Sequence, residues 1–194
     1  MSSHDADDAV DAELWVIRHG ETEWSRSGQH TSVTDLDLTE AGVEVARTLA
    51  EKLAGESFDL VLTSPRLRAR RTAELAGFPE AEVDDDLVEW GYGDYEGRTT
   101  VDIREEVPGW SIWTDPVPNG ETAAQVSERL DRVIERTRDH ERVLLFGHGH
   151  ALRSFAARWI EQPVAEGRFF YLDTATTSVL GYDRDSPVIV RWNS

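Results

Sequence analysis

Arginine or histidine occurs in three short segments of the sequence, and these residue types suit chemistry on an anionic group. The segments are Arg18-His19-Gly20, Thr63 to Arg68, and Gly147 to His150. Arginine offers a planar, charged fork of N–H donors that matches phosphate oxygens. A neutral imidazole is a nucleophile, and neighbouring guanidinium charges lower the pKa of a histidine and keep it neutral. The pattern therefore favours phosphoryl transfer through a histidine, with arginines around the phosphoryl oxygens.

Each segment follows a stretch that is typical of a buried strand, over residues 13–18, 59–63 and 142–147. Apolar periodicity predicts helices between and after these strands, and shorter strands near the C-terminus. The predicted helices cover 39–53, 64–76, 121–139 and 148–160, and the short strands 169–172, 177–182 and 188–192. Alternating strands and helices predict an α/β fold, a three-layer α/β/α sandwich with a mainly parallel central sheet. Ligands of such sheets bind beyond the carboxyl ends of the strands, where the three segments lie.

Two helix starts are also expected to face this edge of the sheet. Ser64 and Pro65 read as the N-cap and first residue of one helix, and His148 precedes another. The exposed N–H groups and positive dipole at a helix N-terminus attract anions. We therefore expect two helix N-termini to add to the anion site.

The net charge, the lack of cysteine and the lack of long apolar runs exclude several classes of protein. The formal net charge is −18, which disfavours binding to nucleic acid or to an anionic membrane. The chain has no cysteine and no apolar run near the ~20 residues that span a bilayer. Residues 1–12 read as a disordered acidic tail and 13–194 as one domain, with 90–120 as a small loop-rich cap. A cytoplasmic location is the default expectation.

With these residues in view, the chain resembles the histidine phosphatase superfamily, also called phosphoglycerate mutase-like, from about residue 14 to residue 192. Four segments carry the resemblance, in the family's order. They are Arg18-His19-Gly20-Glu21-Thr22-Glu23-Trp24, residues 63–72 with Arg68, residues 87–97 with Glu89, and Gly147-His148-Gly149.

The resemblance implies roles for these residues. His19 would attack phosphorus, Arg18, Arg68 and His148 would hold the phosphoryl oxygens, and Glu89 would act as proton donor and then as base. No metal and no cofactor are implied. Many family members have Asn where Ser25 stands, and Ser25 is expected to donate a shorter-reaching hydrogen bond to the phosphate.

Further residues resemble a narrower branch that contains fungal sedoheptulose-bisphosphatases and bacterial acid phosphatases. The matching stretches are 25–31, 85–97 and 148–150. This branch implies a small phosphorylated metabolite, such as a sugar phosphate, as substrate. The residues expected to line the substrate side are His30, Thr31, Trp90, Tyr92 and His150.

Four other functions stay open from the sequence, and one of them is a regulatory phosphatase that acts on phosphoproteins. A cofactor-dependent phosphoglycerate mutase would need a second anion cradle, and residues 98–119 hold only Arg98 and Arg104 as basic residues. A catalytically inactive protein that binds a phosphorylated ligand would keep the fold but form no phosphohistidine. A metallohydrolase would use His148 and His150 as metal ligands. The resemblance leaves a monomer and a homodimer both open.

Overall fold

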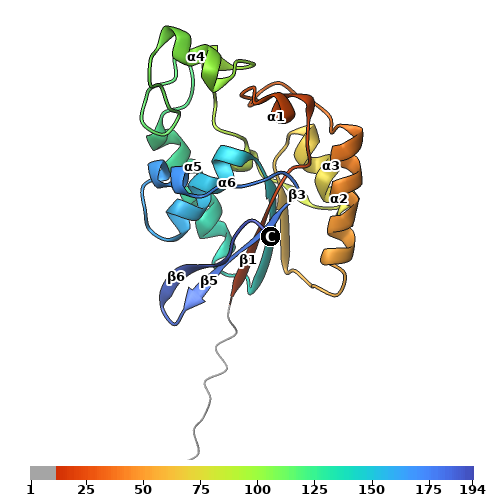
Figure 1. The fold of residues 1–194 in the computed structure, drawn as a ribbon. Coiled ribbons are helices and arrows are strands. Elements are labelled where there is room, and N and C mark those ends of the chain that lie inside the picture. The colour runs from red at the N-terminus through yellow and green to blue at the C-terminus, as the bar shows by residue number, and fades with distance from the viewer. Residues whose placement is uncertain (1–11) are drawn as a thin grey trace, which may run out of the picture.

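A six-stranded sheet forms the centre of the computed structural model, which describes residues 12–194 (Figure 1). The strand order is β3-β2-β4-β1-β5-β6. The strands are β1 (Glu13–Arg18), β2 (Leu60–Thr63), β3 (Glu82–Val83), β4 (Arg142–Gly147), β5 (Thr177–Asp183) and β6 (Ser186–Arg191). The acidic tail predicted for residues 1–12 lies, apart from residue 12, outside the described residues.

Strands β3, β2, β4 and β1 run parallel, and β5 and β6 add an antiparallel edge. The register pairs Arg18 at the end of β1 with Gly147 at the end of β4, and Thr63 on β2 with Phe146. The three polar segments therefore leave the sheet at one edge. The predicted sandwich with a mainly parallel sheet is confirmed.

Helices cover both faces of the sheet: Figure 1 shows α2 and α3 on one side, and α5 and α6 on the other. The helices are α1 (Glu23–Ser27), α2 (Glu40–Lys52), α3 (Leu67–Leu75), α4 (Thr100–Glu106), α5 (Ala123–Thr137) and α6 (Gly149–Trp159). Short 3-10 helices occupy η1 (Asp85–Leu87), η2 (Gly93–Tyr95) and η3 (Val164–Phe169). Within residues 12–194, no helix has the length and apolar character needed to cross a membrane.

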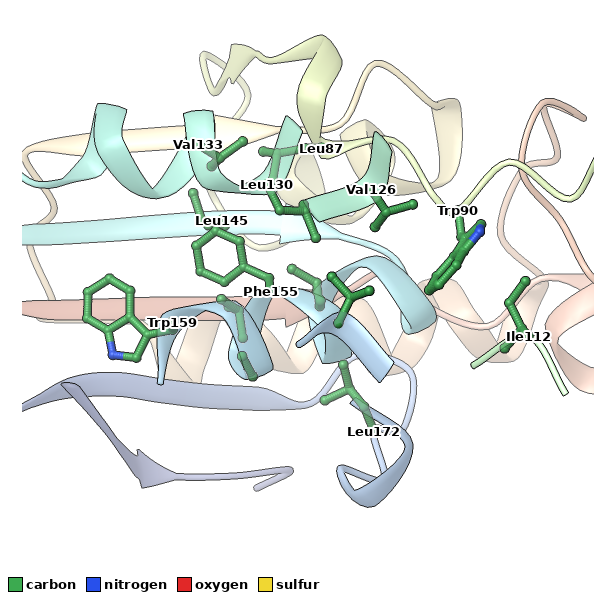
Figure 2. Packing of buried hydrophobic residues seen from close by; sticks show 14 of the residues in the cluster. Leu87, Trp90, Ile112, Val126, Leu130, Val133, Leu145, Phe155, Trp159 and Leu172 are labelled. Atoms are coloured by element: carbon green, nitrogen blue, oxygen red, sulfur yellow. The ribbon is translucent and has the colours of Figure 1, made fainter. Parts of the chain in front are cut away.

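Alternate residues of β1 build two separate cores, as the two-residue period of a strand requires. Trp15 and Ile17 pack in the core beneath α2 and α3. Leu14 and Val16 pack in the larger core beneath α5 and α6, part of which Figure 2 shows around Leu130. Each large apolar side chain buried in this way contributes about 1.5–3 kcal/mol. Both faces of β1 are thereby fixed, and its end holds His19 in place.

The predicted start of helix α3 at Ser64 and Pro65 is wrong. The helix begins at Leu67, and Arg66 is its N-cap without a side-chain hydrogen bond. Instead, Oδ1 of Asp35, from a distant loop, accepts from the Leu67 amide at 2.7 Å. Ser64 is engaged elsewhere, because its Oγ lies 2.7 Å from Nε2 of His148.

Two further differences concern the loops. Residues 169–172, predicted as a short strand, form the end of η3 and an irregular segment. Within the stretch predicted as a loop-rich cap, the structure places η2 and the short helix α4. A capping box stabilises α4, because Thr99 Oγ1 accepts from the Asp102 amide and Asp102 accepts from the Thr99 amide.

Candidate active site

A pocket of about 230 Å³ opens at the carboxyl ends of β1 and β4. Most of the residues predicted for the site line it. These are Arg18, His19, Ser25, His30, Thr31, Glu89, Tyr92 and His150. One cavity therefore brings together residues that are far apart in the sequence. They come from β1, the loop after α1, the segment before η2 and the start of α6.

His19 lies directly after β1, and its amide continues the ladder by donating to the Gly147 carbonyl at 2.9 Å. Its Nδ1 lies 2.7 Å from the Gly20 carbonyl, so Nδ1 carries the proton and Nε2 keeps a free lone pair. Burial, followed by the charges of Arg68 and Arg18, lowers the pKa of His19 well below its usual 6.5. His19 is thus a neutral imidazole at neutral pH, as the sequence predicts, and it can act as a nucleophile.

Arg18 brings a guanidinium to the same pocket. Its Nη1 donates to the Leu172 carbonyl at 2.6 Å, while its buried Nε has no hydrogen-bond partner among residues 12–194. A Cβ on Gly149 would lie 3.3 Å from that Nε, so the glycine leaves the guanidinium close against the start of α6. An unpartnered buried donor is rare, and a bound anion would satisfy it.

Arg68 and His148 lie behind His19, and neither is exposed. Nε of Arg68 donates to Nδ1 of His148 at 3.2 Å, and the rings of His19 and His148 are 5.2 Å apart. The two Nη atoms of Arg68 donate to the carbonyls of Thr31, Ser32 and Thr34. The structure therefore brings all of the predicted phosphate-handling groups into one contiguous cluster, with Arg68 and His148 as its inner layer.

Glu89 lines the same pocket and is 6% exposed. Its Oε1 accepts from the amides of Ala151 at 2.7 Å and Trp90 at 2.8 Å, and its Oε2 accepts from the amide of His150 at 3.0 Å. The amides of His150 and Ala151 belong to the first turn of α6. The helix N-terminus thus orients the carboxylate.

The expectation that two helix N-termini are available to a substrate anion is therefore wrong. Glu89 takes amides at the start of α6, and Asp35 takes the first amide of α3. A carboxylate is itself the kind of group that a helix N-terminus attracts. Both helix starts fix protein side chains, and the charge offered to a ligand comes from guanidinium groups.

Aromatic and imidazole rings form the outer wall. The Tyr92 hydroxyl lies 2.5 Å from Nδ1 of His150, and the His30 ring stacks on Tyr92 at 4.5 Å. Burial raises the pKa of Tyr92 well above 10 and lowers the pKa of His150 well below 6.5. The hydroxyl is therefore the donor, and His150 keeps its own N–H on Nε2.

Two predicted residues behave differently from expectation. Trp90 does not reach the pocket: it is buried in the core, where it meets Trp113 edge to face and donates from Nε1 to the Glu121 carbonyl. Ser25 does line the pocket, but its Oγ accepts from the Thr22 amide and donates to the Thr22 carbonyl, as part of the capping box of α1.

Sequence reasoning missed three polar residues that line the pocket, namely Gln29, Thr100 and Arg153. Arg153 lies four residues after Gly149 on α6, so helical periodicity could have placed it on the same face. It lies over the Trp113 ring at 4.6 Å and donates from Nε to the Gly167 carbonyl. Among residues 12–194, no three His, Asp or Glu side chains converge as a metal site would require.

Comparison with known proteins agrees with this arrangement. The chain is 43% identical to an acid phosphatase of Mycobacterium tuberculosis over 88% of this chain and 86% of the relative. It is 42% identical to sedoheptulose 1,7-bisphosphatase of Saccharomyces cerevisiae over 74% of this chain and 66% of that enzyme. A solved structure of an open reading frame from Mycobacterium tuberculosis superposes with a TM-score of 0.89 at 39% identity, covering 93% and 96% of the two chains. Residues 14–194 match the family model throughout, and the chain belongs to the histidine phosphatase superfamily, branch 1.

Proposed function

We propose that this protein is a phosphomonoester hydrolase that forms a phosphohistidine on His19 and acts on a small phosphorylated metabolite, a sugar phosphate. One observation carries the proposal: a neutral imidazole with a free Nε2 shares a pocket with an arginine that has an unpartnered donor and with a carboxyl group. These are the groups that phosphoryl transfer requires.

In the first step, Nε2 of His19 attacks phosphorus. An N–P bond forms, the bond from phosphorus to the ester oxygen breaks, and protonated Glu89 gives its proton to the leaving alkoxide. The alcohol departs, which leaves phospho-His19 and the Glu89 carboxylate. Proton donation of this kind typically accelerates a reaction by about 10²–10⁴-fold.

In the second step, the Glu89 carboxylate takes a proton from water, and the water oxygen attacks phosphorus. The N–P bond breaks, His19 regains its lone pair and inorganic phosphate leaves. The net reaction consumes one water and one ester and yields one alcohol and one phosphate. Glu89 is again protonated for the next cycle.

Arg18 and Ser25 line the pocket, and we assign Arg18 the direct contact with the phosphoryl oxygens. Arg68 and His148 support the site from behind His19, where the Arg68 charge acts on the His19 ring. Charge held in a buried site is worth more than the same charge in water, because little solvent screens it.

The rest of the pocket favours a hydroxylated substrate. Its wall offers Gln29, Thr31, Thr100 and His150 as neutral hydrogen-bonding groups, and Arg153 adds a cation apart from Arg18. A sugar phosphate matches these groups, and the names of the acid phosphatase and sedoheptulose 1,7-bisphosphatase relatives support the same class.

The structure favours hydrolysis over a mutase reaction. A mutase must retain a second phosphate on the cap side, yet Arg98 pairs with Glu106 and Arg104 donates to the Trp110 carbonyl. Neither arginine lines the pocket. The segment 98–119 thus presents no free cation toward a distal phosphate.

The test is to trap the intermediate. The protein is mixed with a panel of ³²P-labelled sugar phosphates, and separately with 3-phosphoglycerate and bisphosphoglycerate. After quenching, the label is assayed for the acid lability and base stability of phosphohistidine. We expect label in the wild type and in the His140→Ala control, none in His19→Ala, release of inorganic phosphate, inhibition by vanadate and no effect of EDTA. Absence of label with every ester would favour a protein that only binds phosphorylated ligands. Isomerised phosphoglycerate would favour a mutase, and loss of activity in EDTA would favour a metallohydrolase.

A further inference from the structure

We infer that a partly buried ion pair between Glu121 and Arg129 positions Glu89 for proton transfer to the leaving group. The inference rests on the proposed function, because it concerns the step in which Glu89 acts. Neither Glu121 nor Arg129 lines the pocket, so both would act only through the backbone that carries Glu89.

The pair itself is bidentate and largely shielded from solvent. Nε and Nη2 of Arg129 donate to Oε1 and Oε2 of Glu121 at 2.8 and 3.0 Å. The side chains of Arg129 and Glu121 are 6% and 25% exposed. Fork-to-fork pairing of this kind fixes direction as well as distance. Arg129 lies on α5, and Glu121 lies just before the N-cap Thr122 of the same helix.

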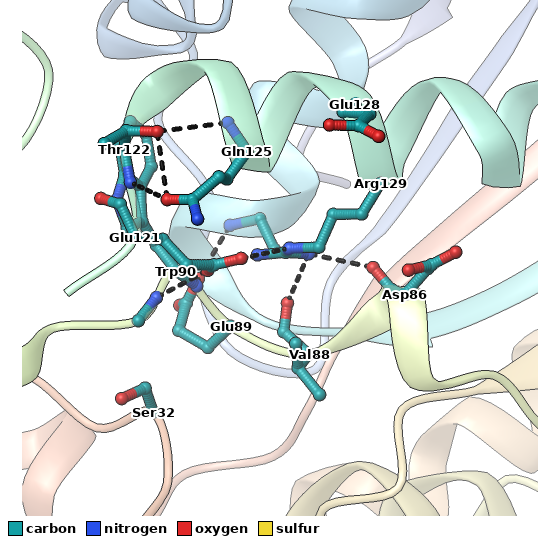
Figure 3. A network of polar contacts seen from close by, with 12 residues as sticks. Ser32, Asp86, Val88, Glu89, Trp90, Glu121, Thr122, Gln125, Glu128 and Arg129 are labelled. Atoms are coloured by element: carbon teal, nitrogen blue, oxygen red, sulfur yellow. Dashed lines mark hydrogen bonds and ion pairs between the residues drawn. The ribbon is translucent and has the colours of Figure 1, made fainter.

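Glu121 holds the backbone on the C-terminal side of Glu89 (Figure 3). Its Oε2 accepts from the Gly91 amide at 2.7 Å, and its own amide donates to the Gly91 carbonyl at 2.9 Å. Its carbonyl accepts from Nε1 of Trp90 at 3.0 Å. A Cβ on Gly91 would lie 3.1 Å from Cγ of Glu121, so the two residues are in close contact.

Arg129 holds the backbone on the N-terminal side of Glu89. Its Nη1 donates to the carbonyls of Val88 at 2.9 Å and Asp86 at 2.8 Å. Residues 88–92 belong to no helix or strand, so no regular ladder fixes this stretch. The two partners of the ion pair therefore hydrogen-bond to the backbone on both sides of Glu89. Arg129 bonds Val88, immediately before Glu89, and Glu121 bonds Gly91, two residues after it.

The carboxylate end of Glu89 is fixed independently by the amides of His150 and Ala151 on α6. Glu89 thus spans two anchors, with its backbone on the α5 side and its carboxylate on α6. A proton donor must lie within hydrogen-bond reach of the leaving oxygen, and displacement by about 1 Å can cost about 10²-fold in rate. Losing the backbone anchor would let the carboxyl group shift relative to His19.

An exposed neighbour supplies a matched control. Arg132, three residues after Arg129 on α5, donates from Nε and Nη2 to the side chain of Asp86 at 2.9 and 2.6 Å. Its side chain is 55% exposed. Arg132→Gln removes an arginine–carboxylate pair from the same helix and the same segment without touching the backbone next to Glu89.

The test compares leaving groups. Arg129→Lys removes the fork, and Glu121→Gln keeps the volume but turns an amide NH₂ toward Arg129. For each variant, kcat/KM is measured with glycerol 1-phosphate, whose alkoxide needs a proton to leave, and with p-nitrophenyl phosphate, whose phenolate does not. Because kcat/KM covers steps only up to the first irreversible one, it reports the phosphorylation of His19 rather than its hydrolysis.

We expect kcat/KM to fall about 10-fold or more with glycerol 1-phosphate and less than about 3-fold with p-nitrophenyl phosphate in both variants. Glu89→Gln should show the same pattern more strongly, and Arg132→Gln should match the wild type. Thermal unfolding and vanadate affinity identify variants that are folded and have an intact site. If Arg129→Lys is too unstable, Glu121→Gln alone tests whether the ion pair positions Glu89.

Equal losses with both substrates in the folded variants, or no loss with either, would overturn the inference. A wild type that is inert with both substrates and takes up no label from any sugar phosphate would instead reject the proposed function itself.

Discussion

Arg68 and His148 form a direct hydrogen bond in which Nε of Arg68 donates to Nδ1 of His148 at 3.2 Å. Because Nδ1 accepts this bond, the ring proton resides on Nε2 and is donated to Oγ of Ser64 at 2.7 Å. Burial, followed by the Arg68 charge, lowers the pKa of His148 well below 6.5, so the ring is neutral. Arg68 thus sets the tautomer of the second histidine and adds to the burial that keeps it neutral.

Replacing Arg68 with Lys should lower kcat/KM for phosphate esters by about 10²–10³-fold. Lysine keeps the charge but cannot reach His148 and the carbonyls of the 31–34 loop with one planar group. Steady-state kinetics check this. Arg71→Lys, on the same helix but paired with Glu74 and outside the pocket, is the control and should change kcat/KM less than twofold. Similar values of kcat/KM in the two variants would show that Arg68 has no specific role in the reaction.

Asp35→Ala should destabilise the fold by about 1 kcal/mol, because it removes the acceptor for the first amide of α3 and a negative charge at its N-terminus. Urea denaturation at neutral pH measures the change. Asp37→Ala is the matched control: Asp37 bonds only the adjacent Leu38 amide among the described residues, so its loss should cost less than about 0.5 kcal/mol. Equal costs would mean that Asp35 does not cap α3.

The free energy of unfolding should fall between neutral pH and pH 5. Burial lowers the pKa of His30 to about 4, against the opposing charge of Glu96. The unfolded chain, with histidine pKa values near 6.5, then binds more protons than the native state, so this stability is full above 6.5 and is lost progressively toward 4. At pH 5, His30 alone should account for about 2 kcal/mol.

Urea titrations at pH 7.5 and pH 5 provide the measurement, with His30→Gln beside the wild type. Burial acts in the same direction on His19, His148 and His150, so some pH dependence remains in the variant. The variant should nevertheless lose clearly less stability than the wild type over this interval. An identical loss would show that His30 titrates normally in the native state.

Tyr92→Phe should raise KM for a sugar phosphate by about 2–10-fold, because the lost hydroxyl no longer holds the tautomer of His150 that presents an Nε2 proton to the substrate. The effect on p-nitrophenyl phosphate, which has no hydroxyl groups, should stay below twofold. Michaelis–Menten parameters for the two substrates decide the matter, and a parallel change in both would assign Tyr92 a structural role only.

Much of the fold could be predicted from the sequence because the relevant signals are local. Continuous apolar runs within 13–18 and 142–147 indicate buried strands, and the 3.6-residue period in 123–137 indicates a helix. Placing His19 and His148 together followed from the rule that parallel strands end at one edge of a sheet. Both predictions needed only spacing and residue type.

The errors came from contacts between distant segments. Nothing near Ser64 reveals that Asp35, which lies 32 residues before Leu67, caps α3. Nor does the sequence around Glu89 show that its carboxylate will take amides of a helix 62 residues later. Trp90 follows Glu89 directly, yet a bond to the Glu121 carbonyl turns its ring into the core. Side-chain direction in irregular segments depends on such partners, which periodicity cannot supply.

The amides that hold Glu89 on α6 have a consequence for how substrate range can change. His19 is joined to β4 through the Gly147 carbonyl, and α6 follows β4 after a single residue, so nucleophile and acid share one rigid frame. A bulkier alcohol cannot be accommodated by widening that frame without separating the two reacting groups. New specificities must therefore arise on the opposite wall, in the loop around Gln29 and in α4, where residues can be exchanged while the reaction geometry stays constant.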